Sequence, residues 1–105
     1  MMSEYLSEAY EDALKDLSTS AGNHVTLVVR SVIESKHILS SFEEKLKALN
    51  LDQTTKQTLL ECVVDLVSNS IANMCVFTGK SFRTDILPLV DQITKKASSP
   101  GLHLQ

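Results

Sequence analysis

Residues 23–50 read NHVTLVVRSVIESKHILSSFEEKLKALN and contain neither glycine nor proline. Apolar residues recur there at the first and fourth positions of a seven-residue repeat, with Ser35 as the one polar member. The members are Val25, Val28, Val32, Ser35, Leu39, Phe42, Leu46 and Leu49. Four consecutive heptads predict one long helix on a bundle seam. A strand over the β-branched run at 25–29 is the alternative. Helix propensities differ there by roughly a few tenths of a kcal/mol per residue, so we expect packing along the seam to prevail.

A second long helix is expected directly after this one. Asn50-Leu51-Asp52 reads as a turn, with Asp52 as the N-cap of a helix over 52–78 and Gly79 as its left-handed C-terminal residue. Apolar residues repeat between these ends at helical spacing, namely Leu60, Val63, Val64, Val67, Ile71, Met74 and Phe77. Because so short a connection joins antiparallel neighbours, the two segments predict a long helical hairpin.

Two shorter helices flank the hairpin. The first is expected over 3–17, with Ser3 as its N-cap and a break at 18–23. The last is expected over 84–97, with Pro88 in its first turn, because a proline deeper inside a helix costs about 3 kcal/mol. Residues 98–105 read as a loose tail. The sequence therefore predicts a single all-α domain over 1–105, a four-helix bundle of short-long-long-short helices.

The helix lengths predict a surface that the chain does not cover. The long helices measure about 40 Å and the short ones about 20 Å, so both short helices cover the same end of the hairpin. The other end, the hairpin tip, presents Leu39, Phe42, Leu46, Leu49, Leu59, Leu60, Val63 and Val64. Since monomers rarely expose patches of this kind, we expect a homodimer joined at the tip.

Composition limits the possible partners and the location. The formal net charge of −3 argues against a nucleic-acid binder that works by bulk electrostatics. The N-terminal stretch lacks the basic and apolar regions of a secretory signal, and no apolar run approaches the roughly 20 residues that span a bilayer. We therefore expect a cytoplasmic protein without a membrane partner. Cys62 and Cys75 lie about 20 Å apart on one predicted helix, and we expect two buried thiols that cannot pair.

Charged residues gather in two places. Residues 1–17 carry five acidic side chains against Lys15 alone, a net charge of −4. The acidic face Glu4, Glu8, Glu11 and Asp12 is a candidate docking site for a basic protein, and a merely solvated helix face is the alternative. A basic corner of Lys80, Arg83, Lys95 and Lys96 is a candidate contact for a phosphate backbone, but four charges favour a corner that is only solvated.

Arg30 and His37 form an R-x6-H pattern. The pattern resembles the motif of the HEPN ribonucleases, small helical dimers in which the Arg and His of each chain meet at the dimer interface. Ser31 departs from the amide or acidic residue that usually follows the Arg. In the heptad register above, Arg30 and His37 both fall farthest from the seam, which favours two solvated side chains.

The residues imply no cofactor and no metal. His24, His37 and His103 do not pair at i,i+4 with each other or with a carboxylate, and the two cysteines lie on different faces. The sequence therefore favours a small non-enzymatic protein that binds another macromolecule, as a regulator, antagonist or immunity-type inhibitor. A HEPN-like ribonuclease and a nucleic-acid-associated regulator that uses the basic corner are the alternatives.

Overall fold

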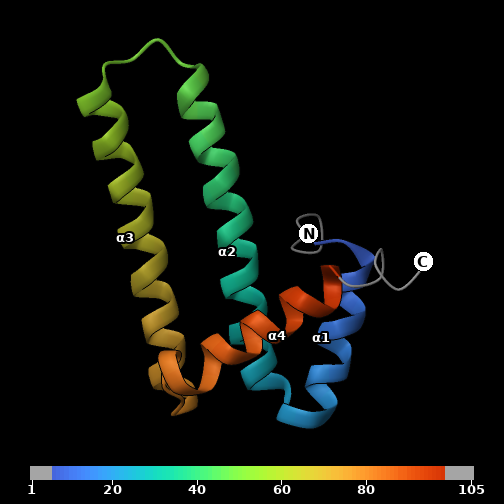
Figure 1. Cartoon of the computed structure of the whole chain (residues 1–105). Helices are drawn as coiled ribbons and strands as arrows, with labels where there is room; N and C mark the ends of the chain where they lie inside the picture. Colours follow the sequence, from blue (N-terminus) through green and yellow to red (C-terminus); the bar gives the residue numbers. More distant parts are fainter. Residues whose placement is uncertain (1–5, 99–105) are drawn as a thin grey trace.

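The structure, a computed structural model, describes residues 6–98. In chain order the elements are α1 (Glu8–Ala21), α2 (Asn23–Ala48), α3 (Gln53–Thr78), a π-helical turn η2 (Phe82–Ile86) and α4 (Leu87–Ser98). The described part of the chain contains helices and no strand, and its four α-helices contact one another (Figure 1). The prediction of an all-α chain with four helices is confirmed.

The two long helices lie side by side and run in opposite directions in Figure 1. Asp52 caps α3, because its carboxylate accepts hydrogen bonds from the backbone N–H of Thr55 at 3.1 Å and from its hydroxyl at 2.7 Å. These bonds lower the pKa of Asp52. Gly79 ends α3 in the left-handed conformation at φ 71°, and the N–H of Lys80 donates to the carbonyl of Cys75. Both predicted caps of this helix are confirmed.

The first helix begins later than predicted. Ser3, the expected N-cap, lies outside the described residues. The structure places the cap at Ser7, whose hydroxyl accepts a hydrogen bond from the N–H of Tyr10 at 3.5 Å. Both serines precede an acidic residue that suits the positive end of a helix, so composition alone did not choose between them.

The first helix also ends later than predicted, and the break expected over 18–23 is confined to Gly22. The polar run stays helical as far as Ala21, and within it the hydroxyl of Ser18 donates to the carbonyl of Lys15 at 2.7 Å. Only Gly22 interrupts the helical conformation between α1 and α2. Its φ is 95°, a value that residues with a side chain rarely adopt. The connection between α1 and α2 is therefore a single residue.

The core gathers at one end of the molecule. The most deeply buried side chains come from α1, α2, η2 and α4, and they are Leu14, Val28, Val29, Ile33, Ile86, Val90 and Ile93. From α3, the buried residues are Ile71 and Cys75, both in the half of the helix nearest this end. We call this end the base. In the described residues, α2 is the only substantial packing partner of α3, whereas α2 also packs on α1, α4 and η2.

The last helical segment begins at Phe82 rather than near Thr84. The hydroxyl of Ser81 accepts from the N–H of Thr84 at 3.4 Å and caps it. Its first turn is π-helical, and the N–H of Leu87 donates to the carbonyl five residues back, at Phe82. Pro88 explains the wide turn, because its ring would collide with the carbonyl four residues earlier in a regular α-helix.

The core at the base predicts a sharp contrast between two neighbouring residues. Ile86 is 0% exposed and Leu87 is 36% exposed. We expect Ile86→Ala to lower the free energy of unfolding by about 2–5 kcal/mol, because it leaves a cavity between packed helices. Leu87→Ala should lower it by about 0.5 kcal/mol or less. Urea denaturation followed by circular dichroism measures both, and equal losses would contradict this placement of the core.

Candidate interaction surface

Helix α3 exposes several large apolar side chains to solvent. Leu66 is 68% exposed, Val76 80% and Phe77 81%. The segment Gln53–Thr78 is also long and apolar enough to cross a membrane by length and composition, and 6% of its most apolar window is buried inside the protein. This corrects the expectation that no apolar run approaches that length. Glu61 and Asp65 interrupt the apolar run, but the surrounding aliphatic residues keep the average hydropathy high.

Three of the exposed apolar side chains of α3 share one face. Leu66 lies seven residues after Leu59 and eleven before Phe77, which is two and three helical turns. The residues between them at heptad spacing are the partly buried Val63 and the exposed Ser70 and Asn73. We define the α3 stripe by these six positions, which are Leu59, Val63, Leu66, Ser70, Asn73 and Phe77. None of them carries a charge.

The charged residues of α3 lie elsewhere on the helix. At 100° per residue, Glu61 and Asp65 point roughly 100–140° away from Leu66. Lys56 is partly buried on the side that faces α2. The charged residues therefore lie away from the α3 stripe, which is neutral along its whole length.

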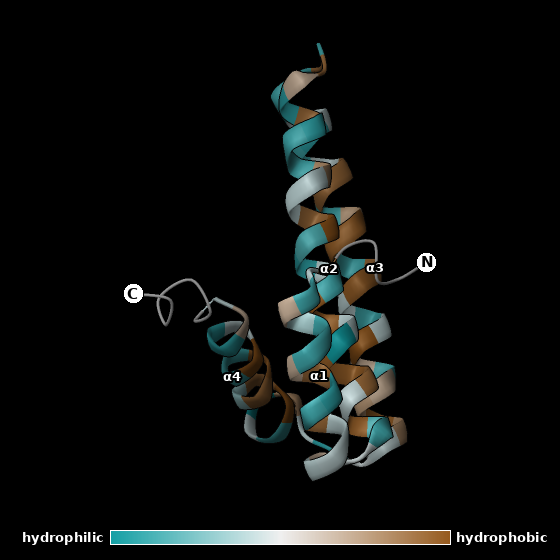
Figure 2. Cartoon of the chain, turned by 90° about the vertical axis from the view of Figure 1, so that its right-hand side faces the viewer, coloured by the Kyte–Doolittle hydropathy of each residue, from teal (hydrophilic) through white to brown (hydrophobic). Residues whose placement is uncertain are grey.

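A residue of α2 continues the α3 stripe. Leu27 is 52% exposed and lines a shallow hollow together with Val28, Met74 and Phe77. Figure 2 shows apolar residues along the edge of α2 and α3 that points away from α4. The sequence reasoning missed Leu27 and Leu66. The signal for Leu66 was the second heptad spacing in α3, beside the spacing that faces α2.

The hairpin covers part of its own tip. Of the eight residues expected to form a dimer interface there, Leu46 is buried between α2 and α3. Four are partly buried, namely Leu39, Phe42, Leu60 and Val63, and three are exposed, namely Leu49, Leu59 and Val64. The most exposed apolar side chains of α3 lie farther along the helix, toward the base.

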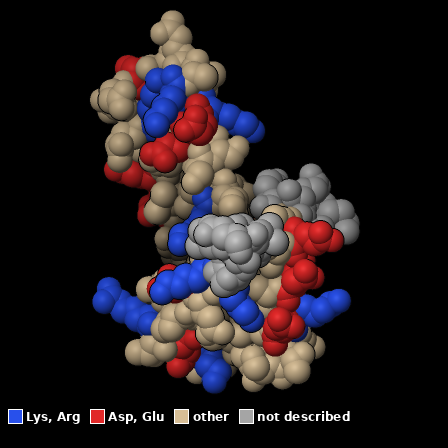
Figure 3. Space-filling view, turned by 45° about the vertical axis from the view of Figure 1, so that its right-hand side comes forward, with Lys and Arg blue, Asp and Glu red and all other residues tan. Residues whose placement is uncertain are grey.

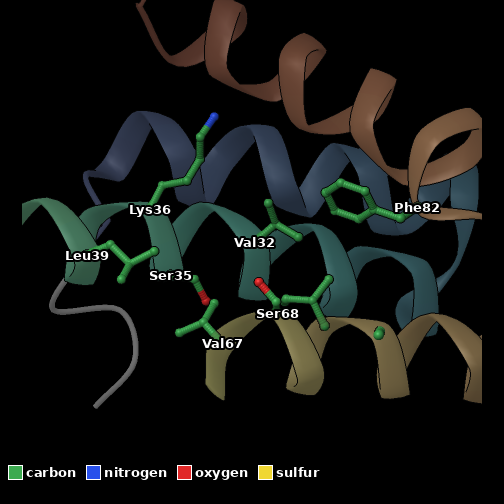
Figure 4. A pocket seen from close by; sticks show the side chains of 9 residues that line it. Val32, Ser35, Lys36, Leu39, Val67, Ser68 and Phe82 are labelled. Carbon is green, nitrogen blue, oxygen red and sulfur yellow. The ribbon is translucent and has the colours of Figure 1, made fainter. Parts of the chain in front are cut away.

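The opposite side of the hairpin, toward η2, contains a groove of about 400 Å³. Figure 4 shows its apolar walls, Val32 and Leu39 of α2, Val67 of α3 and Phe82 of η2, with the serine hydroxyls of 35 and 68 among them. The side chain of Lys36 extends away from the walls. The lining offers apolar contact and two hydroxyls, which suits packing better than acid–base chemistry.

An ion-pair network ties α1 to α2. The guanidinium of Arg30 donates to both carboxylate oxygens of Glu11, at 2.6 and 2.8 Å. The hydrogen bonds from Arg30 lower the pKa of Glu11 and raise the pKa of Arg30. Glu34 lies one turn farther along α2, buried, with its Oε2 atom 3.8 Å from Arg30. Burial raises the pKa of Glu34, since no described group donates a hydrogen bond to that oxygen.

This network changes the interpretation of the R-x6-H pattern. Arg30 is not the solvated side chain that the heptad register predicted, because α1 covers that side of α2. His37 is exposed and meets the ring of Tyr10 edge-on, with centroids 5.7 Å apart. Arg30 therefore pairs with Glu11, and His37 contacts Tyr10. The structure gives no contact between Arg30 and His37 within the chain.

The acidic face of α1 is only partly available. Glu4 lies outside the described residues, and Glu11 is held by Arg30. Glu8 and Asp12 are exposed, and Asp16 lies 3.8 Å from Lys96 of α4. Figure 3 shows acidic side chains gathered along one edge of the broader end of the molecule. A basic partner could therefore use Glu8 and Asp12, while Glu11 already serves the fold.

The predicted basic corner is divided. Lys80 lies just before η2 and Arg83 lies in its first turn. Lys95 and Lys96 lie in the last turn of α4, at the end far from η2. That helix has 12 residues and is about 18 Å long. The four charges therefore do not form one corner, because α4 extends away from α3 across α2 toward α1 (Figure 1).

The two cysteines differ. Both are free thiols in α3, but Cys62 is exposed and Cys75 is buried. The expectation that both are buried is wrong for Cys62, because no helix covers that side of α3 in the described residues. Burial raises the pKa of the Cys75 thiol. Between residues 6 and 98, no three His, Cys, Asp or Glu side chains are placed to hold a metal ion.

The ion pair gives a prediction with a defined pH dependence. The folded-state pKa of Glu11 lies below its unfolded value, so its stabilisation is full at neutral pH and is lost as the pH falls through the folded-state pKa. We expect Glu11→Gln to lower the free energy of unfolding by about 1 kcal/mol at pH 7 and by less in acid. The exposed Glu8→Gln is the control. Equal urea midpoints of the two variants at pH 7 would contradict the ion pair's role.

The thiols give a second prediction. We expect the aromatic disulfide DTNB to react quickly with Cys62 and to reach Cys75 only after unfolding, because the thiolate is the reactive form and burial disfavours it. Cys62→Ser should remove the fast phase, and Cys75→Ser should leave it unchanged. A fast phase that survives Cys62→Ser would show that α3 is placed wrongly on α2.

Comparison with protein-family models, curated proteins and solved structures finds no match to this chain. The functional interpretation therefore rests on the surface itself: an uncharged apolar stripe on a helix that has one substantial partner among the described residues.

Proposed function

We propose that the chain is a non-enzymatic interaction protein that binds another protein through the α3 stripe. The observation that carries this proposal is the exposure of Leu66 and Phe77, 68% and 81%, on a helix whose other face is already packed. Large apolar side chains exposed along one face of a helix mark sites of association in soluble proteins. Such a protein would act as a regulator, antagonist or immunity-type inhibitor by occupying its target.

A protein partner fits this surface better than a lipid bilayer does. The helix is long enough to span, but Glu61 and Asp65 lie in its central part. Each acidic residue near the middle of a bilayer costs about 2.5–3.5 kcal/mol. Against a protein, these side chains keep their water, because they lie on the other side of the helix from the α3 stripe.

A protein partner also fits better than a nucleic acid. The α3 stripe is neutral and the whole chain carries a formal charge of −3. Binding to phosphate backbones relies on lysine and arginine, and the four candidates are split between the two ends of α4. The ribonuclease alternative loses support for a similar reason, because Arg30 is held by Glu11.

Homodimerisation belongs to the same proposal. Two hairpins that bury one apolar side against each other form an intermolecular four-helix bundle, and bundles of four helices around an apolar core are a common way to pack helices. The exposed tip residues Leu49, Leu59 and Val64 support self-association, and the exposure of Leu66 and Phe77 extends the contact toward the base.

Charge substitution on the α3 stripe tests this proposal. We expect Leu66→Glu with Phe77→Glu to abolish binding, whether to itself in light scattering or to a target captured from the native lysate, because two carboxylates would enter the interface. Val76→Glu is the matched control, because Val76 is as exposed as Phe77 but lies about 100° away around the helix. Binding that survives the double variant, or transfer of the protein to phosphatidylcholine–phosphatidylglycerol vesicles, would contradict the proposal.

A further inference from the structure

We propose that the occupant of the α3 stripe is a second copy of this chain. The two α3 helices are antiparallel, and the two-fold axis crosses them at the level of residue 68. The inference rests on the proposed function and names its partner and geometry. It is carried by the spacing of the stripe, by its lack of charge and by the exposures of Leu59, Leu66 and Phe77, which are 40%, 68% and 81%.

The α3 stripe is complementary to itself when one copy is reversed. Its positions alternate steps of four and three residues, the spacing of a coiled-coil seam. An axis at Ser68 makes each pair of facing residue numbers add to 136. Leu59 then faces Phe77 of the second copy, Val63 faces its Asn73 and Leu66 faces its Ser70. Every large side chain of the stripe meets a partner.

Side-chain size supports this register. Leu66, the most exposed leucine, faces the small Ser70, so the two helices can approach closely near the axis. Shifting the register by one heptad in either direction leaves Phe77 or Leu59 without a facing stripe residue. Only the axis at Ser68 buries all three exposed large apolar residues at once.

Electrostatics favours the antiparallel pair over the parallel one. A parallel pair would set Glu61 and Asp65 of both copies at the same level and would align the two helix dipoles. In the antiparallel pair, Glu61 lies level with residue 75 of the second copy. The acidic residues of the two chains are then about 10–20 Å apart along the helix axes.

The available area approaches what a specific dimer needs. From Leu59 to Phe77 the α3 stripe covers 18 residue steps, about 27 Å, and Leu27 of α2 widens it. A face two helix diameters across, about 20 Å, then offers about 540 Å² before the relief of side chains is added. Stable interfaces bury about 800 Å² per partner. Because side chains protrude, the accessible area of this face is larger than its projected area, which brings it nearer to that value.

Disulfide cross-linking tests the register. In a Cys62→Ser, Cys75→Ser background, Val63→Cys with Asn73→Cys places two thiols about 15 Å apart on one helix, too far to pair within a chain. We expect mild oxidation of this protein to convert the monomer band to a dimer band. Single Val63→Cys and Asn73→Cys proteins should each stay monomeric on the gel, and their equimolar mixture should cross-link.

Each alternative outcome is distinct. A dimer by light scattering in which Val63→Cys cross-links alone would indicate a parallel pair and overturn the inference. A dimer in which no combination cross-links would also overturn it. A monomer that still captures a lysate protein in a Leu66- and Phe77-dependent manner would overturn the second copy as occupant and leave the proposed function standing. If the unmodified protein neither dimerises nor captures a protein through the α3 stripe, both the inference and the proposed function are overturned.

Discussion

The fold depends on the unequal cover of its two long helices. Within the described residues, α2 has neighbours on three sides, whereas α3 packs substantially only on α2. A helix with apolar residues on more than one face needs more than one neighbour, because the hydrophobic effect acts on each exposed face. The base is therefore a finished core and α3 is a helix with one free apolar side. Structure and proposed function follow from that difference.

The one-residue link at Gly22 and the ion pair of Arg30 with Glu11 explain why α1 does not supply the missing cover. They turn α1 back along α2 on the side away from α3, and α4 then fills the space between α1 and α2. The two short helices complete the base together. Because α1 and α4 both pack at the base, no described helix remains to cover the free side of α3.

Local signals were readable from the sequence, and long-range ones were not. The caps at Asp52 and Gly79 and the two long helices follow from neighbouring residues, so they could be predicted. The pairing of Arg30 with Glu11 joins residues 19 apart across two helices, and a single-seam heptad register placed Arg30 in solvent. The exposure of Cys62 was missed for the same reason, because an apolar stripe does not say whether another helix covers it.

An exposed apolar helix risks open-ended aggregation, and two acidic residues of α3 oppose it. Glu61 and Asp65 occupy the side of the helix opposite the α3 stripe, so only one side can enter a dry interface. A two-fold contact uses the same stripe on both copies and leaves no stripe free for a third. An apolar surface bounded by charge in this way favours a closed pair over a filament.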